Sequence, residues 1–246
     1  MTVRIAMWSG PRNISTAMMR AFENRPDTEV IDEPFYASFL IRSGADHPMR
    51  QEVLAAQETD PVAVARAISG DAPRGAAIFY QKHMTHHMLA GFDLGWMAKC
   101  RNAFLIRRPE AVLASYSQKR GEATLDDIGV VRQREIFDRE ADRLGHAPPV
   151  VEGADVLADP RGTLGRLCAA LGIPFSDRML AWPAGPRASD GVWAPYWYDS
   201  VWRSTGFRTT SAPDDPLPPE LEPLAEQCTP FYQRLSAHRL KFSPAS

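Results

Sequence analysis

Short apolar runs alternate along the chain with longer segments in which apolar residues recur every three or four positions. The short runs are typical of buried strands, and the longer segments are typical of helices with one apolar face. We predict strands at residues 3–8, 29–31, 76–81, 104–106 and 150–151. We predict helices at residues 14–23, 35–42, 61–69, 110–119, 125–144, 160–171 and 220–238.

This alternation of strands and helices predicts an α/β protein with a parallel sheet covered by helices on both faces. We expect a three-layer sandwich around a mostly parallel sheet of about five strands. The length of 246 residues fits a single domain, residues 1–246. Residues 43–60 are polar and show no clear pattern. We expect residues 182–246, which are rich in loops and aromatic side chains, to form a C-terminal extension packed on the domain.

The amino-acid composition excludes some classes of function but does not identify one. The net charge of −2 argues against general nucleic-acid binding. The three cysteines (Cys100, Cys168 and Cys228) have neither disulfide-framework nor metal-site spacing, which fits a reducing cytoplasm. No signal peptide is evident, and no apolar run reaches the length of about 18 residues that a membrane span needs. We therefore expect a cytoplasmic protein with neither a membrane nor a nucleic-acid partner.

Lysine is scarce in this chain. Only four of the 28 basic residues are lysines, and none precedes Lys82. Base composition explains much of this bias, since alanine and proline are also abundant. It nevertheless excludes any N-terminal phosphate loop that depends on lysine.

The segment between the first predicted strand and the first predicted helix is suited to bind an anion. Free N–H groups and the helix dipole at a helix start attract negative charge. Gly10 permits a tight turn, Arg12 adds a permanent charge with a planar donor fork, and Ser15 and Thr16 add hydroxyl donors. The loop lacks the second glycine and the lysine of a Walker A motif, which disfavours the common kinase or ATPase. The candidate residues are Gly10, Pro11, Arg12, Asn13, Ile14, Ser15 and Thr16.

A second candidate anion site follows the fourth predicted strand. Arg107 stands at the strand end, and Ser115 lies eight residues later, about two helical turns along the next helix. An arginine in the crevice with a hydroxyl beneath it can hold a second phosphate.

Three passages, in this order, resemble the sulfotransferases that use 3′-phosphoadenosine-5′-phosphosulfate. Residues 10–16 resemble the family's 5′-phosphosulfate loop, and residues 107–115 resemble its 3′-phosphate motif. Residues 152–175, with Asp-Pro and Leu-Gly-Ile-Pro-Phe, resemble its late strand–helix segment. The likeness covers about residues 3–23 and 102–180. It implies a P-loop NTPase-like sulfotransferase fold in a bacterial member of the family.

The resemblance also implies the reaction: transfer of a sulfuryl group from 3′-phosphoadenosine-5′-phosphosulfate to a hydroxyl or amine of a small-molecule acceptor, with no metal. Arg12 matches the arginine of the carbohydrate- and protein-sulfating branches, where the cytosolic enzymes carry lysine. The Arg-Lys-Gly stretch that contacts the 3′-phosphate in cytosolic relatives is missing here. Residues 203–208, with Arg208, are the candidate replacement, and simple loop packing is the alternative.

The general base stays open between a glutamate and a histidine. Glu33 follows the second predicted strand and resembles the base of protein-tyrosine-sulfating relatives; a structural ion pair is the alternative. His83 and His86 both fit the histidine that follows Lys-Thr in cytosolic relatives, with helix capping or plain exposure as the alternative. Lys82 is expected to help stabilise the developing charge. A metal on these histidines and His87 is disfavoured, since no cysteine or carboxylate lies nearby in the sequence.

Five large aromatic residues lie within residues 193–202. They are suited to wall an acceptor pocket or to stack on adenine. Core packing or a dimer contact is the alternative, so a homodimer stays among the expected assemblies.

Two other functions remain open on the sequence. One is a nucleotide-dependent phosphotransferase with the same loop geometry, which the missing loop lysine and the lack of a clear Mg²⁺-binding aspartate disfavour. The other is a non-catalytic nucleotide-binding protein, which only a turnover measurement separates from an enzyme.

Overall fold

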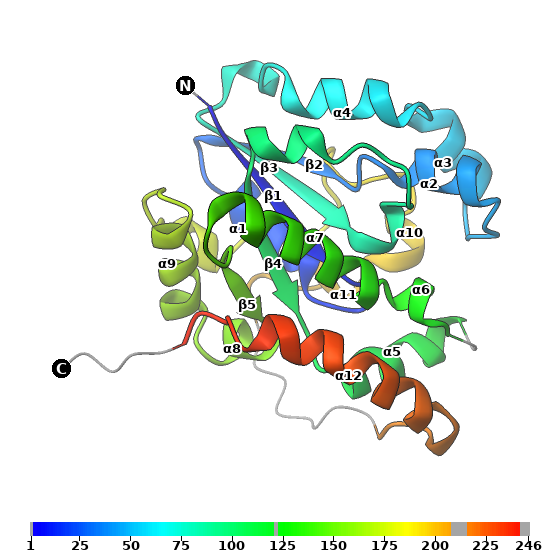
Figure 1. The fold of residues 1–246 in the computed structure, drawn as a ribbon. Helices are drawn as coiled ribbons and strands as arrows, with labels where there is room; N and C mark the ends of the chain where they lie inside the picture. The colour runs from blue at the N-terminus through cyan, green and yellow to red at the C-terminus, as the bar shows by residue number, and fades with distance from the viewer. Residues whose placement is uncertain (1, 121–122, 208–215, 242–246) are drawn as a thin grey trace.

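The computed structural model of the protein describes residues 2–120, 123–207 and 216–241. In this part of the chain the central sheet has five strands, all parallel to their neighbours, in the order β2-β3-β1-β4-β5 (Figure 1). The α/β fold expected from the sequence is therefore confirmed. The strands are β1 (Val3–Ser9), β2 (Thr28–Asp32), β3 (Ile78–Met84), β4 (Arg101–Ile106) and β5 (Val150–Glu152).

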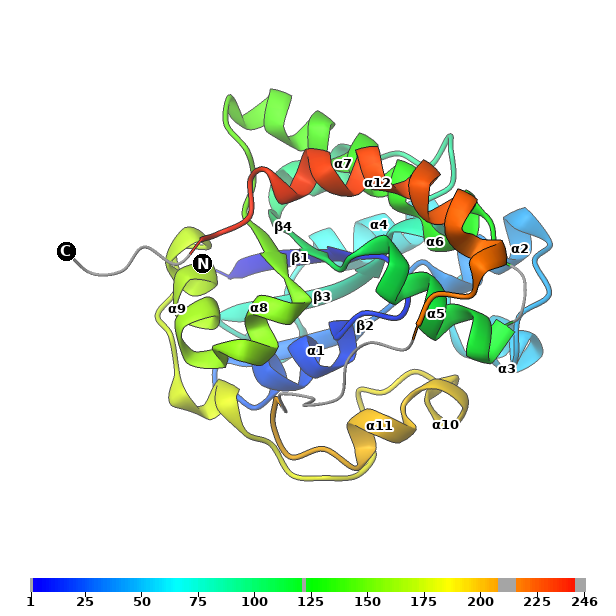
Figure 2. The same cartoon turned by 90° about the horizontal axis from the view of Figure 1, so that it is seen from below.

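Helices cover both faces of the sheet, as the alternating pattern predicts (Figures 1 and 2). One face packs against α1 (Ser15–Glu23), α8 (Gly153–Ala158) and α9 (Pro160–Ala170). The other face packs against α4 (Pro61–Ser69), α7 (Val130–Leu144) and α12 (Glu222–Ser236). The further helices are α2 (Tyr36–Ser43), α3 (Arg50–Ala56), α5 (Pro109–Arg120), α6 (Leu125–Ile128), α10 (Ala194–Trp197) and α11 (Asp199–Trp202). Short 3₁₀ helices occupy Pro73–Gly75, Thr85–His87, Gly95–Lys99, Asp177–Leu180 and Pro219–Leu221.

Among the described residues, no helix combines the length and the apolar character that a membrane crossing would need. The helix predicted at residues 61–69 forms with the same bounds. Asp60 caps it by accepting hydrogen bonds from the backbone N–H groups of Val62 and Ala63, and Pro61 fills the first helical position.

The single helix predicted at residues 125–144 is instead two helices, α6 and α7. Gly129 separates them with a φ of 67°, a conformation that favours glycine. A Cβ at this position would lie 2.8 Å from the backbone nitrogen of His86 and 2.9 Å from Oγ1 of Thr85. The break therefore comes from a close tertiary contact, which an apolar pattern along one segment does not reveal.

Strand β3 runs three residues further than the predicted end at residue 81. Its parallel register places Lys82 beside Met7 and Asp32, and places His83 beside Trp8. Successive side chains of a strand point to opposite faces of the sheet. Lys82 therefore faces the α1 layer, whereas His83 faces the layer of α4 and α7.

The aromatic segment, which we define as residues 182–207, contains α10 and α11 and lies below α1 in Figure 2. It is joined to α1 by a buried ion pair in which Arg20 Nη2 lies 2.5 Å from Asp190 Oδ1. Only 1% of the Arg20 side chain and 5% of the Asp190 side chain are exposed. Asp190 also accepts a hydrogen bond from the Trp202 indole at 3.0 Å, so the carboxylate that binds α1 also ties α11 to it.

We expect Asp190→Ala to lower the free energy of unfolding by about 3 kcal/mol, because it leaves the Arg20 charge buried with Glu23 as its remaining carboxylate. Urea denaturation measures this loss. The matched control is Asp177→Ala, which removes an exposed ion pair with Arg161 and should leave the midpoint nearly unchanged. Equal midpoints for the two variants would contradict the anchoring role of Asp190.

Candidate active site

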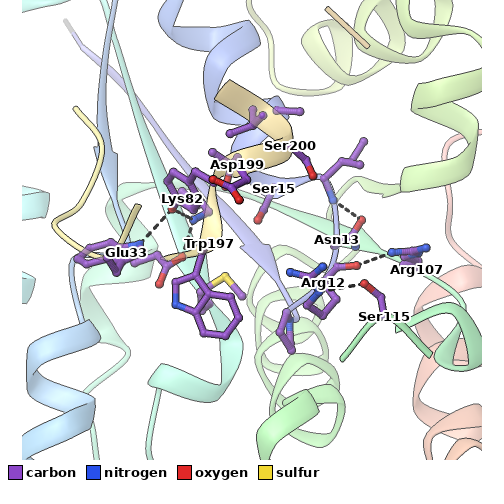
Figure 3. A pocket seen from close by; sticks show the side chains of 18 of the residues that line it. Arg12, Asn13, Ser15, Glu33, Lys82, Arg107, Ser115, Trp197, Asp199 and Ser200 are labelled. Atoms are coloured by element: carbon purple, nitrogen blue, oxygen red, sulfur yellow. Dashed lines mark hydrogen bonds and ion pairs between the residues drawn. The ribbon is translucent and has the colours of Figure 1, made fainter. Parts of the chain in front are cut away.

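A cavity of about 470 Å³ lies at the carboxyl ends of the strands (Figure 3). Residues that follow β1, β2, β3 and β4 line it, and the aromatic segment contributes a further wall. The carboxyl edge of an open parallel sheet is where α/β proteins bind their ligands, near the point where the strand order reverses. The fold thus collects side chains from four loops at one edge.

The loop between β1 and α1 (residues 10–14), which we call the anion loop, forms one end of the cavity, and residues 11–17 lie on its wall. Helix α1 begins at Ser15 without a side-chain cap, and its first internal hydrogen bond joins the Met18 N–H to the Ile14 carbonyl. The first-turn N–H groups before Met18 have no carbonyl partner within the helix, which makes this end suited to an anion.

Glycine at position 10 serves a different purpose from the turn expected in the sequence. A Cβ on Gly10 would lie 2.9 Å from the carbonyl oxygen of Ile128 in α6. Gly10 lines a small neighbouring pocket of about 30 Å³ and not the main cavity. Its absent side chain lets the loop pack against α6, so Gly10 supports the anion loop from behind.

Two arginines meet at this end of the cavity. Arg12 Nε donates to Ser115 Oγ at 2.9 Å, and Arg107 Nη1 donates to the Arg12 carbonyl at 2.7 Å (Figure 3). Burial, followed by the nearby charge of Arg107, lowers the pKa of Arg12. Two guanidinium groups held this close favour a bound anion, because the anion relieves their repulsion.

The opposite end of the cavity carries a buried carboxylate. Glu33 Oε1 lies 2.5 Å from Lys82 Nζ, which also lies 2.8 Å from Asp32 Oδ1. The pKa of Glu33 is raised to about 7: burial raises it most, the charge of Lys82 lowers it, and the charge of Asp32 raises it. Two carboxylates share one ammonium group here, so Glu33 takes up a proton near neutral pH.

Arg12 and Glu33 both have backbone conformations that are unusual for residues other than glycine, with φ of 55° and 42°. Such conformations cost about 1–3 kcal/mol each and concentrate at functional sites. The surroundings hold Glu33 firmly: its N–H donates to the Lys82 carbonyl at 3.0 Å, and its carbonyl accepts from Gln57 Nε2 at 3.2 Å. Both strained backbone positions lie on the cavity wall, whereas Met49 and Arg74, which also have positive φ, do not line it.

The structure does not place His83 at the cavity, which corrects its candidacy as the base. Its ring stacks on Trp8 at a centroid distance of 4.6 Å, and its Nε2 lies 3.2 Å from Gln81 Oε1. Burial lowers its pKa to about 3. The longer β3 turns His83 to the opposite face of the sheet from Lys82, where it is a neutral core residue.

His86 and its neighbour His87 both line the cavity. His87 stacks on Tyr36 at 4.4 Å, and its Nδ1 lies 3.9 Å from Glu33 Oε2. Sequence reasoning considered His87 only as a metal ligand. Among the described residues, no group of three or more His, Cys, Asp or Glu side chains is arranged to hold a metal ion.

The aromatic segment both packs in the core and walls the cavity. Trp193 is buried, Trp197 and Tyr198 line the wall beside it, and the Tyr198 hydroxyl lies 2.7 Å from Lys82 Nζ. Sequence reasoning did not single out Tyr198. Arg208 lies outside the described residues, and Arg203 is exposed and is absent from the cavity wall.

The late passage that resembles the sulfotransferases supports the fold. Asp159 caps α9 by accepting a hydrogen bond from the Gly162 N–H at 2.8 Å. Gly172 ends the same region with a φ of 60°. Gly153 lies behind the anion loop, since a Cβ there would lie 2.7 Å from Asn13 Oδ1. This passage therefore shapes the site from behind and contributes Leu157 to the cavity wall.

Comparison with known proteins identifies the family. A family model described as the Sulfotransferase domain matches residues 3–239. The chain belongs to the sulfotransferase family. Two curated relatives from Arabidopsis thaliana are named branched-chain-amino-acid aminotransferase-like proteins 2 and 1. They are 35% and 37% identical to this sulfotransferase over 95% of its chain. The match spans 41% and 42% of their own lengths, so most of each plant protein lies outside it.

Solved structures share the fold of this sulfotransferase at low sequence identity. The sulfotransferase domain from the curacin biosynthetic pathway gives a TM-score of 0.52 at 16% identity, covering 93% of this chain and 98% of that one. A sulfotransferase from Alicyclobacillus acidocaldarius also gives 0.52 at 14% identity, covering 98% of both chains. The architecture is thus that of the family.

We expect Arg107→Ala to weaken binding of 3′-phosphoadenosine-5′-phosphate about 10–100-fold, the loss that follows removal of one or more hydrogen bonds to a charged group. Isothermal titration calorimetry measures the affinity. Arg134→Ala is the matched control, because Arg134 pairs with Asp138 on α7 and is not a cavity residue. Equal losses in the two variants would show that Arg107 contributes only to the net charge.

Proposed function

We propose that this sulfotransferase transfers a sulfuryl group from 3′-phosphoadenosine-5′-phosphosulfate to a hydroxyl or amine of a small-molecule acceptor. One observation carries the proposal: a single cavity joins an arginine-rich anion site to a buried carboxylate with a pKa near neutrality. The volume of about 470 Å³ falls within the range of small-molecule sites, which supports a small acceptor.

The residues at the basic end fit the donor. Arg12 and the first turn of α1 supply a cation and backbone donors for the phosphosulfate, and Arg107 with Ser115 supplies a cation and a hydroxyl for the other phosphate. This assignment follows the order of the motifs that resemble the family. Bound donor supplies the activated sulfuryl group.

The residues at the acidic end fit proton removal from the acceptor. In the reaction, the acceptor oxygen or nitrogen forms a bond to sulfur. The bond between sulfur and the bridging phosphate oxygen breaks, and its electron pair stays on the departing phosphate. Glu33 takes the acceptor proton, and Arg12 stabilises the negative charge that develops on the leaving oxygen. His86 lines the same cavity and is the alternative base.

We expect Glu33→Gln to lower kcat by about 10²–10⁴-fold, the usual contribution of a general base, while leaving the affinity for 3′-phosphoadenosine-5′-phosphate unchanged. Transfer is measured with radiolabelled donor and a panel of phenols, aliphatic alcohols and amines. His86→Ala is the matched variant, and a large loss there with an active Glu33→Gln protein would move the base to His86. Tight binding of ATP with Mg²⁺, without binding of the bisphosphate, would contradict the sulfotransferase proposal itself.

The pH dependence tests the same assignment. Glu33 must be ionised to accept a proton, and its pKa is raised from 4.5 to about 7. We therefore expect kcat/KM to fall about tenfold per pH unit below pH 7 and to level off above it. The residual activity of Glu33→Gln should lack this acidic limb. A wild-type limb near pH 4.5, typical of an exposed glutamate, would contradict the role of Glu33.

A further inference from the structure

We infer that Lys82, Asp32 and Tyr198 are positioning residues that hold the Glu33 carboxylate toward the acceptor, and that Lys82 does not contact the transferred group. This inference rests on the proposed function and deepens it, because it changes the role that the resemblance to other sulfotransferases gives to Lys82. It also brings the aromatic segment into the reaction through Tyr198.

The hydrogen-bonding capacity of Lys82 is fully used. An ammonium group has three N–H donors. Lys82 Nζ directs them to Asp32 Oδ1 at 2.8 Å, Glu33 Oε1 at 2.5 Å and the Tyr198 hydroxyl at 2.7 Å. Only 1% of its side chain is exposed. Contact with a sulfuryl group would require Lys82 to give up one of these buried bonds.

Asp32 is saturated as well. Its Oδ2 accepts from the Tyr198 hydroxyl at 2.6 Å and from the Gly191 N–H at 3.2 Å, while its Oδ1 accepts from Lys82. Asp32 is not a cavity-lining residue, whereas Glu33 is. Of the two carboxylates, Glu33 is therefore the one positioned to meet an acceptor.

Tyr198 connects Lys82 to Asp32 through its hydroxyl group. Its hydroxyl accepts from Lys82 and from the Trp193 indole at 3.1 Å, and it donates to Asp32. A tyrosine that both accepts and donates fixes the direction of the Lys82 ammonium group. The aromatic segment thereby determines which way the third Lys82 proton points, namely at Glu33 Oε1.

Several other groups face Glu33 from the elements around it. His87 Nδ1 lies 3.9 Å from Glu33 Oε2, and burial lowers the pKa of His87 well below its ordinary value, so it is neutral. The charged neighbours of Glu33 are therefore Lys82 and Asp32, which act in opposite directions on its pKa. The other titratable groups on the same cavity wall are Arg12, Tyr36, His47, His86, Arg107, Tyr116, Tyr198 and Asp199.

Lys82 and Asp32 shift the Glu33 pKa in opposite directions, so substituting each of them tests the inference. The Glu33 pKa is read by NMR titration of carboxyl-labelled glutamate in the free protein, with Glu33→Gln assigning the signal. We expect Asp32→Asn to lower this pKa and Lys82→Met to raise it, each by about one unit or more, the usual effect of one charge within hydrogen-bond range. The acidic limb of kcat/KM should move in the same direction as the NMR value in each variant.

Tyr198→Phe is the conservative variant, and it retains the ring. We expect it to raise the Glu33 pKa and to lower kcat about tenfold or more, while KM for the donor and affinity for the bisphosphate stay unchanged. Tyr196→Phe, two residues earlier in the aromatic segment and outside the cavity wall, is the matched control and should match wild type.

A Lys82→Met protein that fails to fold is replaced by the double variant Lys82→Met/Asp32→Asn, which removes both charges together.

Two outcomes would overturn the inference. One is a Lys82→Met protein that loses kcat at every pH without any shift of the Glu33 pKa, as a lysine on the transferred group would give. The other is a Tyr198→Phe protein with wild-type activity and pH profile. Failure of the proposed function looks different, since wild type would then neither bind the bisphosphate nor transfer label, while the NMR titration would still report on the four side chains.

Discussion

The buried ammonium group of Lys82 is the interaction on which the rest of the site depends. It joins β3 to Asp32 at the end of β2, to Glu33 in the strained loop that follows, and to Tyr198 in the aromatic segment. These partners are 50, 49 and 116 residues away along the chain, respectively. Removing one partner from a buried ion pair typically costs about 3–5 kcal/mol, because the other charge is left unpaired. The Lys82 side chain thus holds both Glu33 and Tyr198 in place on the cavity wall.

The sheet topology explains why the two ends of the cavity can differ so strongly in charge. Strand β1 lies between β3 and β4, so the anion loop after β1 has the Glu33 and Lys82 side on one flank and Arg107 on the other. Arg12 and Arg107 repel each other, and a bound anion offsets this repulsion. Glu33 and Lys82 form a separate, compensated group. The fold therefore keeps a carboxylate in the same cavity as two arginines without letting them pair.

Much of the fold could be predicted from the sequence, because strand and helix patterns are local. The positions of the anion loop and Arg107 on one cavity wall were also predictable, since both follow strands whose carboxyl ends must meet. The sheet faces to which Lys82 and His83 point were not predictable. They depend on the three additional residues of β3, and pairing with β1 and β2 sets the length of that strand. The contact of Tyr198 with Lys82 was not predicted: the segment that carries Tyr198 is held by contacts distant in sequence, among them the Arg20–Asp190 ion pair. Long-range anchors of this kind leave no periodic signal.

The charge balance of the acidic end gives a physical reason for its chemistry. With Glu33 ionised, Lys82, Asp32 and Glu33 together carry one excess negative charge in a buried setting, and burial disfavours net charge. Protonation of Glu33 brings the three groups to neutrality. In the proposed reaction, a proton taken from the acceptor would therefore remove a buried charge, at the same moment as the departing phosphate gains negative charge beside Arg12. The two ends of the cavity each become better compensated as the reaction proceeds, which is how fixed charges favour a transition state over the bound reactants.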